Sequence, residues 1–319
     1  MTPPPVPLRL ARRPLVVFGL LLRRAAREFS YHDPLRLGAA TAFFATFALP
    51  PIVIILIQGL GSLYSASQVR VLLLTKLSHL LGASAAGLVE QILRNVTDVQ
   101  RSRLVTWLGF AFLLFIATTL FGVIQHSLNQ IWQVRVRRSS GQLRTVLKER
   151  TRSLGLLLAT GLLSMLAFLS DAALGFAAHY AEYFDASFSQ LVLEAGNKFF
   201  SLLIIVGWCG VTFRNLSSAK VPRKAVWRGA LLTGSLISLG ESVLGLLLVP
   251  RNLGPIYGPA SSIVLVLLFV FYSAMIFYFG ACFTKAYTHH AGLDIRPKKS
   301  AVRYKLVDVV EEDEVRSEK

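Results

Sequence analysis

Two carboxylates lie inside long apolar stretches of this 319-residue chain: Glu241 near the middle of 229–250 and Asp171 towards the end of 153–178. No lysine or arginine lies within these stretches. A carboxyl group in an apolar helix bundle either takes up a proton or faces a hydrated cavity. The functional interpretation is a proton relay, or a site for a cation or a lipid headgroup. The structural interpretation is a protonated acid hydrogen-bonded across a helix contact; both stay open for Glu241, and the structural one is favoured for Asp171.

Other chemistry has no sequence support. The six histidines show no metal-ligand spacing, and the two cysteines, Cys209 and Cys282, lie in apolar stretches where a thiol packs as a small hydrophobe. Phosphate-binding, nucleophile-elbow and dinucleotide-binding motifs are absent from the sequence. We therefore expect no enzyme activity, no metal and no cofactor.

The elements that must position the two acids are membrane-spanning helices. Hydrophobic residues make up 54% of the chain and charged residues 16%, and about 20 consecutive apolar residues suffice to cross a bilayer. The predicted fold is all-α, a polytopic membrane protein with six transmembrane helices at about 37–60, 104–132, 153–178, 199–213, 229–250 and 260–284. Glu241 shares a helix face with Gly234, Ser238 and Gly245, which predicts close approach of a neighbouring helix.

Three further segments complete the predicted organisation. Residues 1–36 form a basic cytoplasmic segment with an amphipathic interfacial helix, and 61–103 form a periplasmic segment with interfacial helices. Residues 286–319 form a charged cytoplasmic tail that we expect to be disordered. Within the first span, Pro50 and Pro51 remove two backbone donors and predict a kink. Trp132 is expected to anchor at the interface and Lys285 to extend into the headgroup layer.

The basic residues set the orientation. Of the 34 lysines and arginines, 27 fall on the side that holds both termini and seven on the other, so both termini are predicted to be cytoplasmic. This distribution accounts for the net charge of +17 through contact with anionic lipid, leaving no role for nucleic acid. The residues expected to attract headgroups are Arg135, Arg137, Arg138, Arg214, Arg223 and Lys224.

Several short motifs resemble the YihY/virulence factor BrkB family, which carries an older ribonuclease BN label. They are Ser127-Leu128-Asn129-Gln130-Ile131-Trp132, Phe213-Arg214-Asn215-Leu216, and Gly254-Pro255-Ile256-Tyr257-Gly258 followed by Phe271-Tyr272-Ser273 and Gly280-Ala281. The resemblance implies a multi-pass protein of the bacterial inner membrane, linked to envelope integrity and to a suggested role in moving lipids. The chain departs from the family pattern at Ser217, where a proline is usual, and at Cys282, where an acid is common.

The expected function is transport or translocation of a lipid or other amphipathic anionic molecule, as by a flippase. The expected substrate or proton pathway contains Glu241, Asp171, Pro50, Pro51, Asn129, Tyr257 and Tyr272. The alternative is a non-catalytic scaffold for envelope integrity. Membrane lipids are the expected partners, with a homo-oligomer or an envelope protein as further possibilities. Ribonuclease activity is not expected, because a metal-dependent nuclease needs a cluster of His and Asp side chains.

Overall fold

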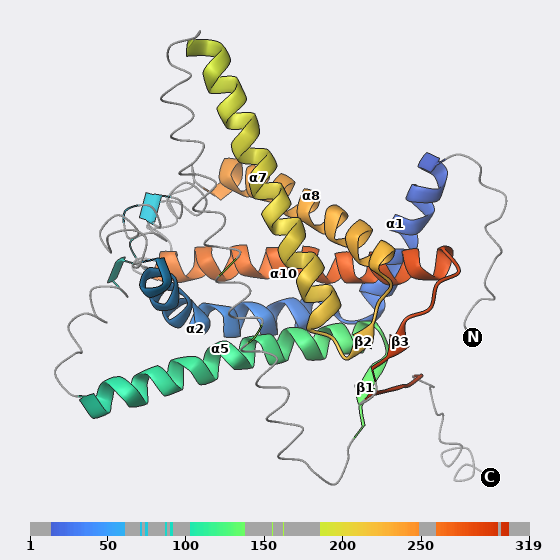
Figure 1. The fold of residues 1–319 in the computed structure, drawn as a ribbon, viewed down its shortest axis with the longest axis horizontal. Coiled ribbons are helices and arrows are strands. Elements are labelled where there is room, and N and C mark those ends of the chain that lie inside the picture. Colours follow the sequence, from blue (N-terminus) through green and yellow to red (C-terminus); the bar gives the residue numbers. More distant parts are fainter. Residues whose placement is uncertain are drawn as a thin grey trace, which may run out of the picture.

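Helix α10 (Ser261–His290) lies at the centre of the structure. The computed structural model describes residues 14–60, 103–137, 186–248, 260–298 and 301–305, with a few isolated positions between them. Helices α2 (Pro34–Leu60) and α5 (Arg103–Ile131) lie along one side of α10 (Figure 1). Helix α8 (Arg223–Leu248) packs on another side and in turn contacts α7 (Ala186–Asn215). Helix α1 (Pro14–Tyr31) packs against the C-terminal part of α10.

The chain is mostly helical, as the sequence predicted. Five of the six predicted spans coincide with α2, α5, α7, α8 and α10, and the third, 153–178, falls almost wholly outside the described residues. Among the described residues one helix, Ile263–His290, is long and apolar enough to cross a membrane, and Pro34–Leu49 is a shorter apolar helical segment. Six crossings therefore remain a prediction. The predicted segment 61–103 also lies largely outside the described residues.

Two helices extend beyond their predicted ends. Helix α7 begins at Ala186 instead of near 199. Its first turns contain polar residues, which a helix tolerates, and no proline, which would interrupt it. Helix α10 continues past 284 to His290. It ends where Gly292 adopts φ 66° and the amides of Gly292 and Leu293 donate to the carbonyls of His289 and Thr288. This is a Schellman motif, in which glycine occupies the left-handed position at no steric cost.

Two small antiparallel sheets correct the prediction of an all-helical chain with a disordered tail from 286. Strand β1 (Val134–Val136) pairs with β4 (Ala301–Arg303), and β2 (Ala219–Lys220) pairs with β3 (Arg296–Pro297). The segment that carries β3 and β4 thus joins the end of α5 to the turn between α7 and α8 (Figure 1). It is ordered because its backbone amides find partners in both segments, which composition alone does not reveal.

Helices α8 and α10 approach closely through a reciprocal pair of glycines and threonines. A Cβ atom placed on Gly229 would lie 1.8 Å from Thr284 Oγ1, and one on Gly280 would lie 1.7 Å from Thr233 Oγ1. Each threonine hydroxyl donates to a carbonyl of its own helix, Thr233 to Gly229 at 2.7 Å and Thr284 to Gly280 at 2.8 Å. Each hydroxyl therefore has a hydrogen-bond partner within its own helix, and the two helices need not separate to supply one. Small residues at such a contact let the two backbones approach closely.

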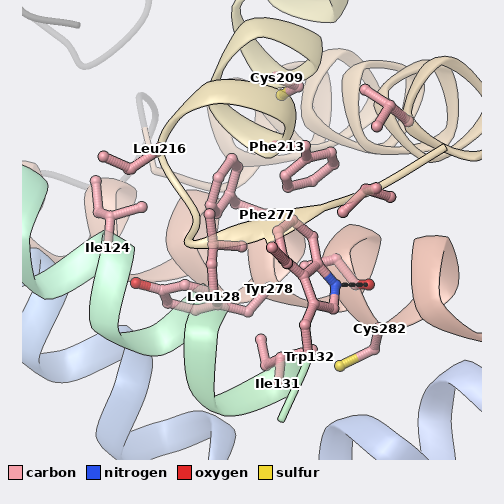
Figure 2. Close-up of a cluster of buried hydrophobic side chains, with 14 of the residues drawn as sticks. Ile124, Leu128, Ile131, Trp132, Cys209, Phe213, Leu216, Phe277, Tyr278 and Cys282 are labelled. Carbon is pink, nitrogen blue, oxygen red and sulfur yellow. Dashed lines mark hydrogen bonds between the residues drawn. The ribbon is translucent and has the colours of Figure 1, made fainter. Parts of the chain in front are cut away.

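An aromatic cluster fills the space between α5, α7 and α10 (Figure 2). The Phe213 ring lies 4.9 Å from the Phe277 ring and 6.1 Å from the Trp132 ring, measured between centroids. Trp132 is buried, and its indole nitrogen donates to the carbonyl of Ala281 at 3.2 Å, drawn as a dashed line in Figure 2. The interface anchor predicted for Trp132 is therefore wrong, because the ring is buried and contacts Phe213 of α7 and Ala281 of α10. Cys209 and Cys282 are buried free thiols, as predicted.

Candidate functional site

Glu241 lies on α8 with its side chain partly buried. Two turns earlier, Gly234 packs against α7, where an added Cβ would come within 2.6 Å of Val206 Cγ2. Gly240, the residue before Glu241, packs against the Tyr272 ring of α10. A Cβ added to Gly240 would lie 2.4 Å from this ring. Among the described residues, none forms a hydrogen bond or ion pair with Glu241. The predicted close helix approach on this face is present, and the carboxyl group lies beside it without a polar partner from the described chain.

Asn129 is buried near the end of α5, and its amide forms hydrogen bonds with the turn after α7. Its Oδ1 accepts from the amide of Ser218 at 2.8 Å and from the hydroxyl of Ser217 at 3.0 Å, and its Nδ2 lies 3.4 Å from Ser218 Oγ. Gln125, one turn earlier, adds a longer contact to Ser218 Oγ at 3.5 Å. Because its oxygen already accepts two hydrogen bonds and its nitrogen donates one, the Asn129 amide is better suited to joining two helix ends than to contacting a passing substrate.

A basic end is formed where α5, α7 and α10 end and α8 begins (Figure 1). Arg135 and Arg137 follow α5, Arg214 ends α7, and Arg223 and Lys224 begin α8; all five are exposed. Asp294 pairs with Arg303 at 3.1 Å, and none of the five cations forms an ion pair with another residue that the structure describes. Exposed guanidinium and ammonium groups on one end of a bundle attract anionic headgroups.

The structure describes three of the remaining predicted pathway residues, Pro50, Pro51 and Tyr272, and places Tyr272 beside the residue that precedes Glu241. Helix α2 runs through Pro50 and Pro51 without interruption, and Figure 1 shows that it changes direction along its length. Tyr272 lies on α10 against Gly240. The predictions for Asp171, Tyr257 and Arg138 concern residues outside the described part of the chain. Within the described part, no group of three His, Cys, Asp or Glu side chains is placed to hold a metal ion.

Comparison with known proteins identifies the family. The model of the family described as "Virulence factor BrkB" matches residues 25–304, which covers most of the chain. The chain belongs to this family. This BrkB family member is also 25% identical over 249 residues to proteins named "UPF0761 membrane protein" from Pseudomonas paraeruginosa and from two Pseudomonas aeruginosa strains, LESB58 and UCBPP-PA14.

The match covers 76% of this chain and 57% of each relative, so the aligned region spans little more than half the length of these curated relatives. No solved structure is significantly similar to the chain. The names of the relatives support a membrane location. Their names specify neither an activity nor a substrate.

The two departures from the family pattern both have a structural account in this BrkB family member. Ser217, in place of the usual proline, donates its hydroxyl to Asn129 and accepts from the amide of Ala219 at 3.0 Å. Cys282, in place of the common acid, is fully buried in the aromatic cluster, where a thiol packs as a small hydrophobe.

Sequence reasoning missed an ion pair that joins α1 to α10. Lys285 is buried, and its Nζ donates to Glu28 Oε2 at 2.6 Å. The imidazole Nε2 of buried His32 lies 3.7 Å from the same oxygen, within ionic range and too far for a hydrogen bond. His32 and Lys285 lower the pKa of Glu28 from 4.5 to about 2, against the opposing effect of burial. The spacing of Glu28 and His32 by four residues was a signal, but nothing in the sequence pointed to Lys285.

Sequence reasoning also missed Lys298, which lies just after β3. Its ammonium group donates to the carbonyl of Ser217 at 2.6 Å and lies within 3.5 Å of the carbonyls of Asn215 and Arg214. Its backbone amide donates to Ser218 at 2.9 Å. The last carbonyls of a helix have no partner within the helix, and a cation there also interacts favourably with the helix dipole. Lys298 therefore caps α7 and closes the basic end.

Proposed function

We propose that this protein acts in the bacterial inner membrane as a transport or translocation protein for a lipid or other amphipathic anionic molecule. Both termini are proposed to be cytoplasmic, which places the basic end on the cytoplasmic side. Membrane lipids would then be its main partners, and the exposed arginines would concentrate anionic headgroups at that side.

The observation that carries the proposal is Glu241. It is the one acidic residue of α8, it is partly buried, and it has no hydrogen bond or ion pair with the described residues. An ionisable group in the apolar part of a membrane helix is costly and is retained where it serves a path for protons, ions or polar groups. The cations at the start of the same helix supply the attraction for an anion, and Glu241 supplies the polar position farther along.

The proposal is tested by reconstituting the purified protein into liposomes and measuring translocation of a fluorescent anionic phospholipid between leaflets. Glu241→Gln keeps the shape of the side chain and removes its charge and its ability to exchange a proton. We expect this variant to fall to the rate of protein-free liposomes. Asp294→Asn is the matched control, because it removes an exposed carboxylate at the basic end. Wild-type activity in Glu241→Gln would contradict the proposed path.

A non-catalytic scaffold for envelope integrity is the second candidate. It is favoured by Asn129, which the pathway hypothesis assigned to a substrate and which instead ties α5 to the turn after α7. A scaffold would show no translocation, would tolerate Glu241→Leu in cells, and would crosslink to one envelope protein or to a second copy of the chain. Crosslinking in intact cells followed by mass spectrometry separates the two candidates.

We further propose that the protein is not an enzyme and does not bind nucleic acid. Incubation of the purified protein with labelled RNA, with and without divalent metal ions, tests this directly. Metal-dependent cleavage that co-purifies with the protein would contradict it.

A further inference from the structure

The exposed residues of α8 form one continuous stripe along the helix. The α8 stripe consists of Lys224, Arg228, Leu231, Ser235, Leu239 and Val243, all exposed and spaced three or four residues apart. It is basic where the helix begins and mainly apolar beyond Arg228. Trp227, beside Arg228, is 55% exposed at the boundary between the two parts.

The packing of α8 explains why this face points outward. Gly229 and Thr233 face α10, and Gly234 faces α7. A helix with two neighbours fixed on adjacent faces has its remaining face left open. Rotation of α8 would bring a residue with a side chain to the place of Gly229, where an added Cβ would overlap Thr284 Oγ1. The contact at Gly229 therefore keeps the stripe facing outward.

Arg228 is held in place by Tyr287 of α10. Its guanidinium carbon lies 4.6 Å from the centre of the Tyr287 ring, and Nη1 donates to the tyrosine hydroxyl. Guanidinium has five N–H donors in a planar arrangement, so one hydrogen bond to Tyr287 leaves the others available for the oxygen atoms of a phosphate. The stacking also restricts the side chain before any ligand arrives, which lowers the entropic cost of binding.

We propose that the α8 stripe binds one anionic phospholipid of the cytoplasmic leaflet, with its phosphate on Arg228 and Lys224 and its acyl chain along Leu231 and Leu239. This inference rests on the proposed function and names its substrate class and binding position. Trp227 lies at the depth of the headgroup boundary, the position that tryptophan prefers in membranes.

The dimensions of the stripe match this ligand. Eleven residues separate Arg228 from Leu239, a rise of about 16 Å along a helix. One leaflet of hydrocarbon is about 15 Å thick. A phosphate at Arg228 therefore places an acyl chain along the apolar part of the stripe. A soluble anion would use the cations and leave that part unoccupied.

Quenching of tryptophan fluorescence tests the proposal in nanodiscs that contain the full chain. Brominated phosphatidylglycerol and brominated phosphatidylcholine are compared at the same mole fraction, and Trp227→Phe defines how much of the signal comes from Trp227. We expect brominated phosphatidylglycerol to quench this signal at lower mole fraction. Since one cation near the surface contributes about 1 kcal/mol, Arg228→Gln should reduce that preference about fivefold.

Arg27→Gln is the matched control, because it removes an exposed arginine of α1 that belongs neither to α8 nor to the basic end. It should keep the preference within about twofold of the wild type, since a distant exposed charge is screened. Tyr287→Phe should retain the ring that supports Arg228, whereas Tyr287→Leu should weaken the preference. The site would be overturned if both lipids quenched the wild-type protein about equally, or if Arg228→Gln and Arg27→Gln lost the preference to the same extent.

If neither lipid quenched Trp227, the proposal would also be overturned, because another protein surface would then cover the stripe. The readout does not involve translocation. Preserved lipid preference with no translocation would contradict the proposed function and leave the binding site standing. Translocation without a lipid preference at Trp227 would contradict the binding site and leave the proposed function standing.

Discussion

The Nζ atom of Lys285, near the end of the central helix, lies 2.6 Å from Oε2 of Glu28 on α1. The lysine side chain is 8% exposed and the glutamate side chain 39% exposed. This pair fixes α1 against α10, together with the edge-to-face contact of Phe29 and Phe279 at 5.7 Å between ring centroids. Helix α1 is therefore packed on the bundle through its apolar face as well as through a charge.

The two halves of this ion pair should respond unequally to mutation. Glu28→Gln leaves a buried ammonium group without its counter-charge, whereas Lys285→Met leaves a carboxylate that water can still reach. We expect Glu28→Gln to lower the free energy of unfolding by about 2–3 kcal/mol and Lys285→Met by about 1 kcal/mol. The double variant should recover part of the loss. Thermal unfolding of the purified protein in detergent measures the difference, and equal losses would contradict the proposed asymmetry.

The same pair predicts a dependence of stability on pH. The pKa of Glu28 is lowered from 4.5 to about 2 by His32 and Lys285. The unfolded chain therefore takes up a proton at Glu28 before the folded protein does, and the stabilisation, fully present above pH 4.5, is lost as the pH falls towards 2. We expect the difference in unfolding temperature between wild type and Glu28→Gln to shrink between pH 5 and pH 3. A constant difference over this interval would assign the effect of the mutation to packing.

The helices could be predicted from the sequence because their signal is local. Long apolar stretches predicted α2, α5, α8 and α10, and the position of Gly234 predicted a close helix contact on the face of Glu241. Helix ends were less predictable. The sequence of α10 contains a lysine at 285 that resembles a membrane boundary, yet the helix continues because α1 supplies a carboxylate and covers the side chain.

The candidate site was harder to predict from the sequence than the helices, because its contacts join residues that are far apart in the chain. Asn129 and Ser217 are 88 positions apart, and Glu28 and Lys285 are 257 apart. The basic composition of 296–305 is equally typical of a disordered tail and of a segment that pairs with β1 and β2. Only the arrangement of the helix ends distinguishes the two, since it places acceptor carbonyls of α7 beside Lys298.

The contact of α8 with α10 predicts that Gly229 tolerates no side chain. In Gly229→Ala the new Cβ would overlap Thr284 Oγ1, so the helices must separate. We expect a loss of about 1–3 kcal/mol in the free energy of unfolding. Adding Thr284→Ala removes the overlapping hydroxyl and should restore part of the loss, because the next atom, Thr284 Cβ, lies 3.0 Å away.

Gly207→Ala on α7 is the control for the Gly229 variant. Nothing lies within 4 Å of a Cβ at this position, so alanine should be neutral or stabilising by up to about 1 kcal/mol. Unfolding temperatures in the same detergent compare the three variants. A Gly229→Ala protein as stable as Gly207→Ala would show that the two helices are not in close contact.

The C-terminal segment should detach when its anchor on α7 is removed. In Lys298→Met the carbonyl of Ser217 loses its charged donor, while the backbone hydrogen bond from residue 298 to Ser218 can still form. We expect a loss of about 1–2 kcal/mol locally and faster amide hydrogen exchange in 295–304, because local opening sets the exchange rate. Lys224→Met removes an exposed cation from the same end without a described carbonyl contact and should leave this exchange unchanged. Equal exchange rates in Lys298→Met and the wild type would mean that strand pairing with β1 and β2 alone holds the segment.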